Sequence, residues 1–272
     1  MKAVKRIVLY TLVTVGALVM VFPFFWMLIS SLKTAAEVNT TPPTFWPEHL
    51  VWENYAFAFS KAPFGTYFIN SVLVTVACVA STMFTTILAA FAFSRLKFPG
   101  RDLLFSISLS MMMVPFEMLI ITNYSTIVKL GLMDTLAALI IPFMTSIFYT
   151  YILRNFFLSV PDSLYYSTRV DGAGNWTFLW RIMVPIAKPA LVTIGLLNAI
   201  TCWNSFLWSV LVTNSTEVRT LPFGLYAFMT SSGIRYERLM AAATIVVVPM
   251  IILFIFCRKS IVTGVSRGGL KG

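Results

Sequence analysis

The chain has 272 residues, of which 58% are hydrophobic and only 11% are charged, and its mean hydropathy is +0.85. Charged residues make up about 25% of an ordinary soluble domain, so this composition excludes that class and predicts a polytopic membrane protein. A net charge of +10 would favour nucleic acid as the partner of a soluble chain. Here the basic residues flank apolar runs, as orientation signals do, so we expect no nucleic-acid partner.

Six apolar runs are long enough to cross the hydrocarbon core, which takes about 20 residues of helix. We therefore predict an all-α chain that forms one transmembrane domain over residues 1–272. The predicted helices cover residues 8–31, 67–94, 103–126, 135–153, 189–212 and 239–257. Lys2, Lys5 and Arg6 precede the first run, which is too long for a signal peptide and lacks an A-x-A cleavage site, so we expect it to be retained.

Proline residues lie within these predicted helices or at their starts, and each removes a backbone donor and favours a kink. They are Pro23, Pro115, Pro142, Pro185, Pro189 and Pro249. Such kinks are tolerated in a membrane where neighbouring helices or water satisfy the carbonyl groups that are set free.

The distribution of basic residues predicts the orientation of the chain. Alternating the six helices from a cytoplasmic N-terminus places fourteen of the 20 Lys and Arg residues inside and six outside. Cytoplasmic loops carry the excess of Lys and Arg, so we expect both termini in the cytoplasm.

Residues 160–188 lie between two apolar runs but carry Asp162, Arg169, Asp171, Arg181 and Lys188. Charges without partners are expensive in a bilayer, so this segment must leave it, on the cytoplasmic side in the predicted topology. Apolar residues recur at helical spacing on both sides of Asp171-Gly172, which predicts two short amphipathic helices around a glycine turn. An apolar helix face outside the lipid favours a protein groove as its partner.

Asp171-Gly172-Ala173, Ile182, Pro185 and Pro189 match the cytoplasmic loop that defines the membrane subunits of ATP-binding-cassette importers. The chain resembles that family here, although Tyr166-Ser167-Thr168 stands where the family has E-A-A. The resemblance implies a coupling helix that docks into a cleft of the ATPase subunit. The implied coupling residues are Tyr166, Ser167, Thr168, Val170, Asp171, Gly172, Ala173 and Pro185. An ordinary amphipathic loop helix is the alternative.

Further landmarks resemble the carbohydrate-uptake branch of these permeases, to which the second membrane subunit of the maltose transporter belongs. They include Asn54-Tyr55, Asn70-Ser71, Ala92-Phe93-Ser94-Arg95 before Phe98-Pro99-Gly100, and Gly269-Leu270-Lys271-Gly272. The resemblance implies a bacterial inner-membrane importer of sugars, with an oligosaccharide or glycerol-phosphate as variants of the cargo. Its partners would be a second, related permease, two ATPase subunits that bind ATP and magnesium, and an external solute-binding protein.

The residues themselves agree that this chain does not hydrolyse ATP. No G-x-x-x-x-G-K-S/T phosphate loop and no catalytic arrangement of Ser, His and Asp is present, so we expect no enzyme activity and no cofactor in the chain. Cys78, Cys202 and Cys257 lie in apolar runs without a C-x-x-C pattern, which predicts neither a disulfide framework nor a metal site.

Polar groups in helix interiors are candidates for a solute path. Exposing such a group to lipid without a hydrogen bond costs on the order of several kcal/mol. A sugar has an apolar ring face and a hydroxyl edge, which aromatic rings, amides and a carboxylate suit. The candidates are Glu117, Asn123, Tyr124, Asn198, Trp203, Asn204 and Trp208. Packing between helices is the alternative role, or an outer-leaflet anchor for Trp208.

The predicted external loop 214–238 contains Ser231, Ser232, Gly233, Ile234 and Arg235. In the maltose relative the corresponding loop reaches into the binding protein, so the resemblance implies the same contact here. Ordinary turn formation is the alternative.

An ion-gradient-driven secondary transporter with Glu117 as its ion site is the rival function. Inverted halves and paired broken helices would favour it. The hydropathy pattern has no such symmetry, and that function would leave Asp171-Gly172-Ala173 unexplained.

Overall fold

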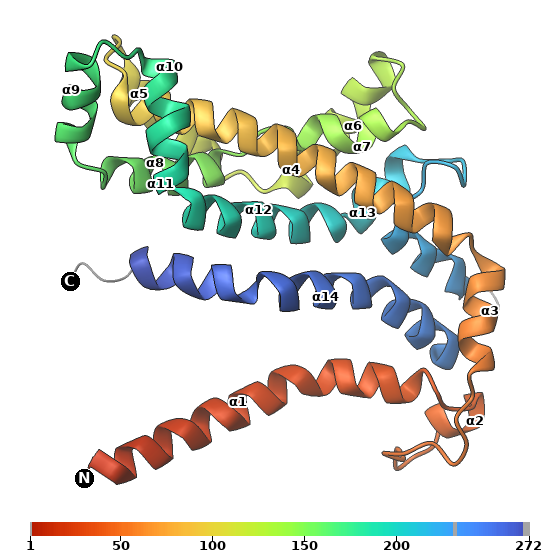
Figure 1. The fold of residues 1–272 in the computed structure, drawn as a ribbon. Helices are drawn as coiled ribbons and strands as arrows, with labels where there is room; N and C mark the ends of the chain where they lie inside the picture. The colour runs from red at the N-terminus through yellow and green to blue at the C-terminus, as the bar shows by residue number, and fades with distance from the viewer. Residues whose placement is uncertain (1, 231–232, 269–272) are drawn as a thin grey trace. The chain divides into compact units, whose positions relative to one another are not determined.

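The computed structural model of this chain describes residues 2–230 and 233–268, and almost all of its regular structure is helical (Figure 1). By contacts the chain divides into two compact units. Unit 1 comprises Met1–Gly65 and Leu221–Met250, and unit 2 comprises Thr66–Thr220 and Ile251–Gly272. The helices α4, Phe64–Arg95, and α14, Tyr236–Gly268, contribute residues to both.

Three helical stretches are long and apolar enough to cross a membrane without a break. They are Val4–Ser30 within α1 (Lys2–Ser30), Phe64–Arg95, which is α4, and Tyr236–Phe256 within α14. Pro23 and Pro249 lie inside α1 and α14 without ending them. Three further pairs of helices qualify only when each pair is taken as one bent span, which gives up to six spans among the residues described.

The predicted third, fourth and fifth helices are therefore broken rather than continuous. α5 (Arg101–Met111) and α6 (Phe116–Lys129) meet at 97° beside Pro115, which sits in extended conformation before α6. α7 (Leu136–Ile140) with the 3-10 turn Ile141–Phe143 meets α8 (Ile147–Leu158) at 45°. The stretch Asn175–Ile186 meets α12 (Lys188–Trp203) at 78°, just before Pro189.

The break inside the predicted fifth helix, 189–212, lies further along the chain than the 78° bend, which precedes that helix. α12 ends at Trp203, and α13 (Phe206–Val212) begins after Asn204 and Ser205, whose ψ of 73° is not helical. The sequence around this break contains no proline, and its apolar pattern continues across it, so the sequence analysis did not predict the break.

Side chains of neighbouring helices satisfy the carbonyl groups near the α7–α8 bend. Pro142 has no N–H to donate to the carbonyl of Ala138, and the indole N–H of Trp208 on α13 donates to that oxygen instead at 2.9 Å. On α4, the hydroxyl of Thr82 donates to the Phe143 carbonyl at 2.6 Å and that of Thr85 to the Met144 carbonyl at 2.9 Å. The bend is thus stabilised by α4 and α13.

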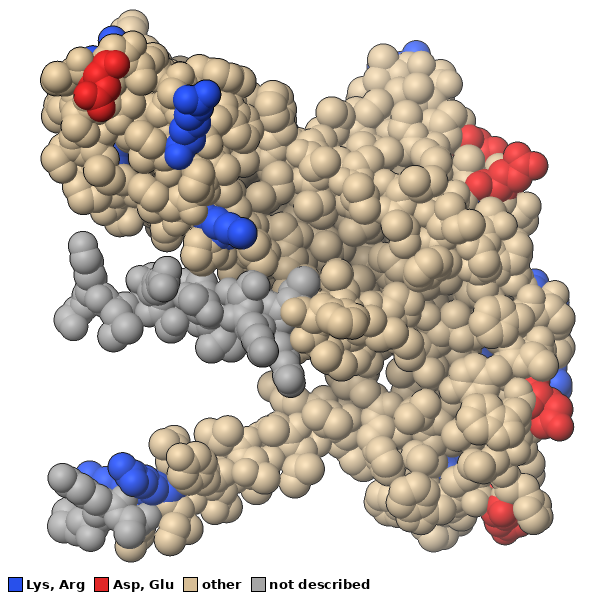
Figure 2. Space-filling view, in the orientation of Figure 1, with Lys and Arg blue, Asp and Glu red and all other residues tan. Residues whose placement is uncertain are grey.

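Two apolar clusters form the core of unit 2. One gathers Phe91, Leu153, Phe157, Phe178 and Met183 with their neighbours near the 160–188 segment. The other gathers Cys78, Ile127, Leu139, Trp208 and Val212 with theirs, from α4, α6, α7, α12 and α13. Figure 2 shows charged side chains of unit 2 at its α9–α10 end and again on the α6 side, with uncharged surface between them.

Unit 1 contains α1, α2 (Ala35–Val38), α3 (Glu53–Lys61), the 3-10 helix Leu221–Phe228 and a short hairpin. The Asn54 amide donates to the carbonyls of Ser31 and Lys33 at 3.0 and 2.9 Å, which fixes the chain after α1 against α3. The buried Lys33 ammonium donates to the Thr44 carbonyl and lies 4.6 Å from the centre of the Trp26 ring. Lys33 is therefore a paired structural residue.

Candidate functional site

The 160–188 segment forms the two helices that its periodicity predicts. They are α9 (Asp162–Val170) and α10 (Asn175–Phe178), which continues through the π-helical turn Leu179–Met183 into α11 (Val184–Ile186). The N–H of Ala173 donates to the Thr168 carbonyl and that of Gly172 to the Arg169 carbonyl, both at 3.1 Å. This pair of bonds is a Schellman ending, in which Gly172 takes a φ of +77°.

The inner face of α9 packs on α10. Tyr165 meets the buried ring of Phe178 edge-on at 5.1 Å, and its hydroxyl donates to the Asn175 side chain at 2.9 Å. Thr168 is buried, and its hydroxyl donates to the Leu164 carbonyl. Thr168 therefore faces the protein rather than a partner, whereas the sequence placed it among the coupling residues.

The outer face of this segment is apolar and open. Tyr166 is 60% exposed, Val170 87% and Trp176 63%. Ser167, Asp171, Gly172 and Pro185 are exposed as well, and Ala173 is partly buried. Trp176 was not among the predicted coupling residues. Trp176 belongs to the apolar pattern around the glycine turn, and this pattern could have indicated it as a coupling residue.

Arginine side chains tie this loop to the neighbouring helices. Arg95, at the end of α4, pairs with the carboxylate of Asp162 at the start of α9 and donates to the carbonyls of Phe157 and Val160. From the sequence, Arg95 was interpreted as a family landmark and as one of the basic residues on the cytoplasmic side. Nothing in its spacing indicates contacts more than 60 residues away.

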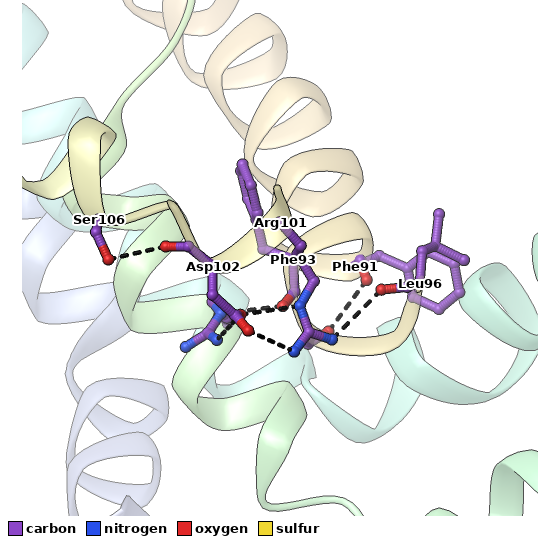
Figure 3. Close-up of polar contacts among 8 residues, drawn as sticks. Phe91, Phe93, Leu96, Arg101, Asp102 and Ser106 are labelled. Carbon is purple, nitrogen blue, oxygen red and sulfur yellow. Dashed lines mark hydrogen bonds and ion pairs between the residues drawn. The ribbon is translucent and has the colours of Figure 1, made fainter. Parts of the chain in front are cut away.

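A second polar cluster lies where α4, α5 and α8 meet (Figure 3). Arg101 binds the Asp102 carboxylate with contacts of 3.0 and 3.3 Å and donates to the Leu96 carbonyl. Arg154, on α8, donates to the Phe93 carbonyl at 3.1 Å and lies 4.0 Å from the same carboxylate. Arg101 and Arg154, which the predicted topology places on the cytoplasmic side, therefore join helix ends in addition to carrying charge.

Three of the predicted solute-path residues lie on α6. Glu117 is exposed in its first turn, directly after the Pro115 break, Asn123 is half-buried and Tyr124 is 37% exposed. The ring of Phe116 stacks edge-on against Trp208 at 6.0 Å, so the first turn of α6 lies against α13.

The other four candidates belong to α12, α13 and the break between them. Asn198 is buried and its amide nitrogen has no partner among the residues described, while its oxygen accepts from the Cys202 thiol at 3.5 Å. Trp203 is buried beside the Phe68 ring. Asn204 is exposed where α12 ends.

Trp208 is 2% exposed, and its indole is bonded to the Ala138 carbonyl. Its ring lies within the core cluster of unit 2, so in this structure the residue packs helices and stabilises the bend at Pro142.

The predicted contact loop lies only partly within the structure described. Ser231 and Ser232 lie outside the described residues, and Gly233–Ile234 form β2, antiparallel to β1 (Met229–Thr230). Arg235 binds the buried Glu237 carboxylate at 2.8 Å, and Arg238 lies 3.9 Å from the same oxygen. Among the residues described, no cluster of three or more His, Cys, Asp or Glu side chains could hold a metal ion.

The chain was compared with known proteins. The profile of the family described as binding-protein-dependent transport system inner membrane component matches residues 81–267. The arabinooligosaccharides transport system permease protein AraQ of Halalkalibacterium halodurans is 30% identical over 279 residues, which covers 100% of both chains. The diacetylchitobiose uptake system permease protein NgcG of Streptomyces coelicolor is 30% identical and covers 96% of this chain and 88% of that protein.

Among solved structures, a chain of a bacterial ABC transporter involved in the import of the acidic polysaccharide alginate is similar to this one. Its TM-score is 0.79 at 26% sequence identity, and the match covers 94% of this chain and 96% of the other.

Proposed function

This chain belongs to the family of binding-protein-dependent transport system inner membrane components, and we propose that it is the solute-translocating subunit of an ATP-driven importer. It is a multi-pass membrane protein of a transport system. The observation that carries the rest of the proposal is the segment 160–188, which presents Tyr166, Val170 and Trp176 on an exposed apolar face outside the three unbroken apolar spans. A face of this kind is suited to docking in a groove of a partner protein.

The partners follow from what this chain lacks. It has no phosphate loop, so in the proposed ATP-driven importer the energy of transport would come from ATPase subunits that bind ATP and magnesium and hold α9 and α10. A second, related permease would complete the path. Only 6% of the apolar stretch of α1 is buried, so its surface is available to a further partner or to lipid. An external solute-binding protein would deliver the cargo. Both termini would lie in the cytoplasm.

The proposed cargo is a sugar or oligosaccharide. The relatives that cover nearly all of the chain are named for the transport of arabinooligosaccharides and diacetylchitobiose. The proposed path residues are Glu117, Asn123, Tyr124 and Asn204, together with Asn198 and Trp203, which are buried on α12. Exposed amides, a carboxylate and aromatic rings offer both hydrogen bonds and an apolar face to a sugar.

The mechanism would be alternating access. Closure of the ATPases moves α9 and α10, and connected helices carry that movement to the path between α6, α12 and α13. A solute biases this switch only through its different affinities for the two states.

Purification of the complex from native membranes tests this function. ATPase subunits and a second permease should co-purify, and proteoliposomes should take up a radiolabelled arabino-oligosaccharide or diacetylchitobiose only with ATP and the binding protein present. A complex without ATPase subunits whose uptake follows an ion gradient would contradict the proposal.

The path residues are tested in the same assay. Glu117→Ala and Asn204→Ala should lower transport while assembly with the ATPases is retained. Asn155→Ala removes a matched exposed amide on α8 and should transport normally. Normal transport by both path variants would mean that these residues only pack or face lipid.

A further inference from the structure

The side chain of Arg95 is buried, although a basic residue close to it in the chain is exposed. Arg95 is the last residue of α4, and its side chain is 5% exposed, whereas Lys97, two residues further on, is exposed. A buried guanidinium needs partners for its charge, because burial without them is strongly unfavourable. Both terminal nitrogens of Arg95 have partners, whereas its Nε is buried with none among the residues described.

The guanidinium joins three helices at one point. One terminal nitrogen pairs with the carboxylate of Asp162, the first residue of α9. The other donates to the Phe157 carbonyl at 2.6 Å, in the last turn of α8, and to the Val160 carbonyl in the link to α9. α4, α8 and α9 therefore meet at a single side chain.

The electrostatics of the helix ends favour this arrangement. The last carbonyls of α8 have no partners within their helix and form the negative end of its dipole, which a cation stabilises. Asp162 in the first turn of α9 places its negative charge at the positive end of that helix. Arginine suits the site because its planar fork donates in several directions at once, which a lysine ammonium cannot reproduce with the same geometry.

We propose that Arg95 is the positioning residue that transmits displacement of the docking segment to α4. This inference rests on the proposed function, in which the ATPases move α9. If α9 moved alone, the buried Arg95 guanidinium would lose the carboxylate of Asp162 and keep only the carbonyls of Phe157 and Val160. This loss favours a shift of α4 together with α9.

The other contacts of α4 connect it to the bend between α7 and α8. Thr82 and Thr85 on the same helix bind the carbonyls of Phe143 and Met144 at the bend between α7 and α8. The Ala138 carbonyl beside that bend is held by Trp208 on α13. A shift of α4 therefore reaches α13 and the helix break next to Asn204 through bonds that already exist.

If Arg95 only held the fold together, its loss would have different effects from the loss of a residue that transmits movement. Loss of a purely structural contact lowers the amount of folded complex and its ATPase binding together with transport. Loss of a transmitting contact leaves assembly and ATP hydrolysis intact and lowers only the amount of solute moved per ATP.

The experiment compares Arg95→Lys, Arg95→Ala and Asp162→Asn with Lys97→Gln as the matched control, which removes an exposed charge from the same loop. ATPase association, binding-protein-stimulated ATP hydrolysis and sugar uptake are measured in proteoliposomes. We expect Arg95→Lys to keep ATPase association and hydrolysis within about twofold of wild type and to move about tenfold less sugar per ATP, because the charge remains but the fork is lost.

Asp162 is 73% exposed, so its removal should lower sugar moved per ATP by only about threefold, as for a solvent-screened ion pair. Lys97→Gln should match wild type. Arg95→Ala should lose at least as much as Arg95→Lys in this ratio.

Wild-type sugar per ATP in Arg95→Lys, or ATPase binding that falls in parallel with transport, would overturn the inference and leave the proposed function standing. Failure of the wild-type chain to bind ATPases at all would overturn the proposed function itself.

Discussion

Gly172 is the residue on which the shape of the docking segment depends most directly. Its φ of +77° lies in the left-handed region, and a Cβ added there would meet nothing within 4 Å, so a side chain would be excluded by the backbone conformation and not by space. A β-branched residue at this position must change the turn between α9 and α10.

Gly172→Val should therefore uncouple transport from ATP hydrolysis while the membrane helices stay folded. Gly174→Val is the matched control, because Gly174 has a φ of −81° that valine adopts readily and also has open space around it. Transport and ATP hydrolysis in proteoliposomes check both variants. Full coupling in Gly172→Val would exclude this turn as the coupling element.

Asp134 ties the loop after α6 to the loop after α13. Its carboxylate accepts the backbone N–H groups of Asn214 and Ser215 at 2.7 and 2.8 Å. These bonds, Ser215 first, hold the pKa of the Asp134 carboxyl below its usual range. Asp134 also has a φ of 58°, which asparagine tolerates, so Asp134→Asn changes the charge with little change in backbone preference.

The pH dependence of stability follows from this lowered pKa. A carboxyl whose pKa is depressed on folding stabilises the folded state above its unfolded pKa of about 3.9, and this contribution is lost as the pH falls through the folded pKa. The melting temperature of wild type should exceed that of Asp134→Asn by a constant margin from about pH 7 to about pH 5, and the margin should shrink below about pH 4. A margin that does not change with pH would mean that the carboxylate charge contributes nothing.

At the level of elements, α9 has one face committed to its own protein and one face free. Tyr165 and Thr168 hold the inner face against α10 and its own backbone, and Tyr166 and Val170 form the outer face. Since tyrosine stands where the family has glutamate, docking in this protein should depend on burial of apolar surface more than on an ion pair.

Tyr166→Ala should then weaken ATPase association. Burial of about 100 Å² of apolar surface contributes about 2.5 kcal/mol at about 25 cal/mol per Å². The loss should change little between about 0.1 and about 0.5 M salt, because screening acts on charges. Ser163→Ala, an exposed change on the same helix, is the control. A pull-down of ATPase subunits measures both, and a loss that depends strongly on salt would favour an ionic contact.

The bent spans show how this fold tolerates helix breaks at membrane depth. A proline or a non-helical residue frees backbone groups, and side chains from other helices satisfy them, as Trp208, Thr82 and Thr85 do around Pro142. The same breaks place Glu117 and Asn204 at helix ends, where polar groups can face a path. The helix breaks are therefore the places where we expect residues of the solute path.

At the scale of the whole molecule, the basic-residue asymmetry predicts which side each loop faces. A cysteine at residue 174 should react with an impermeant maleimide only from the cytoplasmic side, and one at residue 214 only from outside. Cys78 and Cys202 are buried and should contribute little background. Labelling of Gly174→Cys and Asn214→Cys in intact cells and inverted vesicles measures this. Reversed accessibility would contradict the orientation and, with it, the docking role of α9.

The sequence by itself determined the class of this protein, its family, the approximate positions of its apolar spans and the two amphipathic helices around Gly172. The family follows from the resemblance of Asp171-Gly172-Ala173 and the other motifs to those of known permeases. The other features follow from composition, hydrophobic period and local backbone preference, which are local properties of the sequence. The same reasoning indicated kinks at Pro115 and Pro142 but not the break at Asn204-Ser205, which has no local signal.

Only the tertiary structure decided what individual polar and aromatic side chains do. Trp208 reads as a path residue in the sequence, yet it serves the carbonyl left free by Pro142, which lies far earlier in the chain. Thr168 reads as a docking residue, yet α9 turns it inward. Arg95 reads as a landmark and becomes the junction of α4, α8 and α9. Such roles depend on which groups from distant segments are left without partners, and that is fixed only when the helices pack.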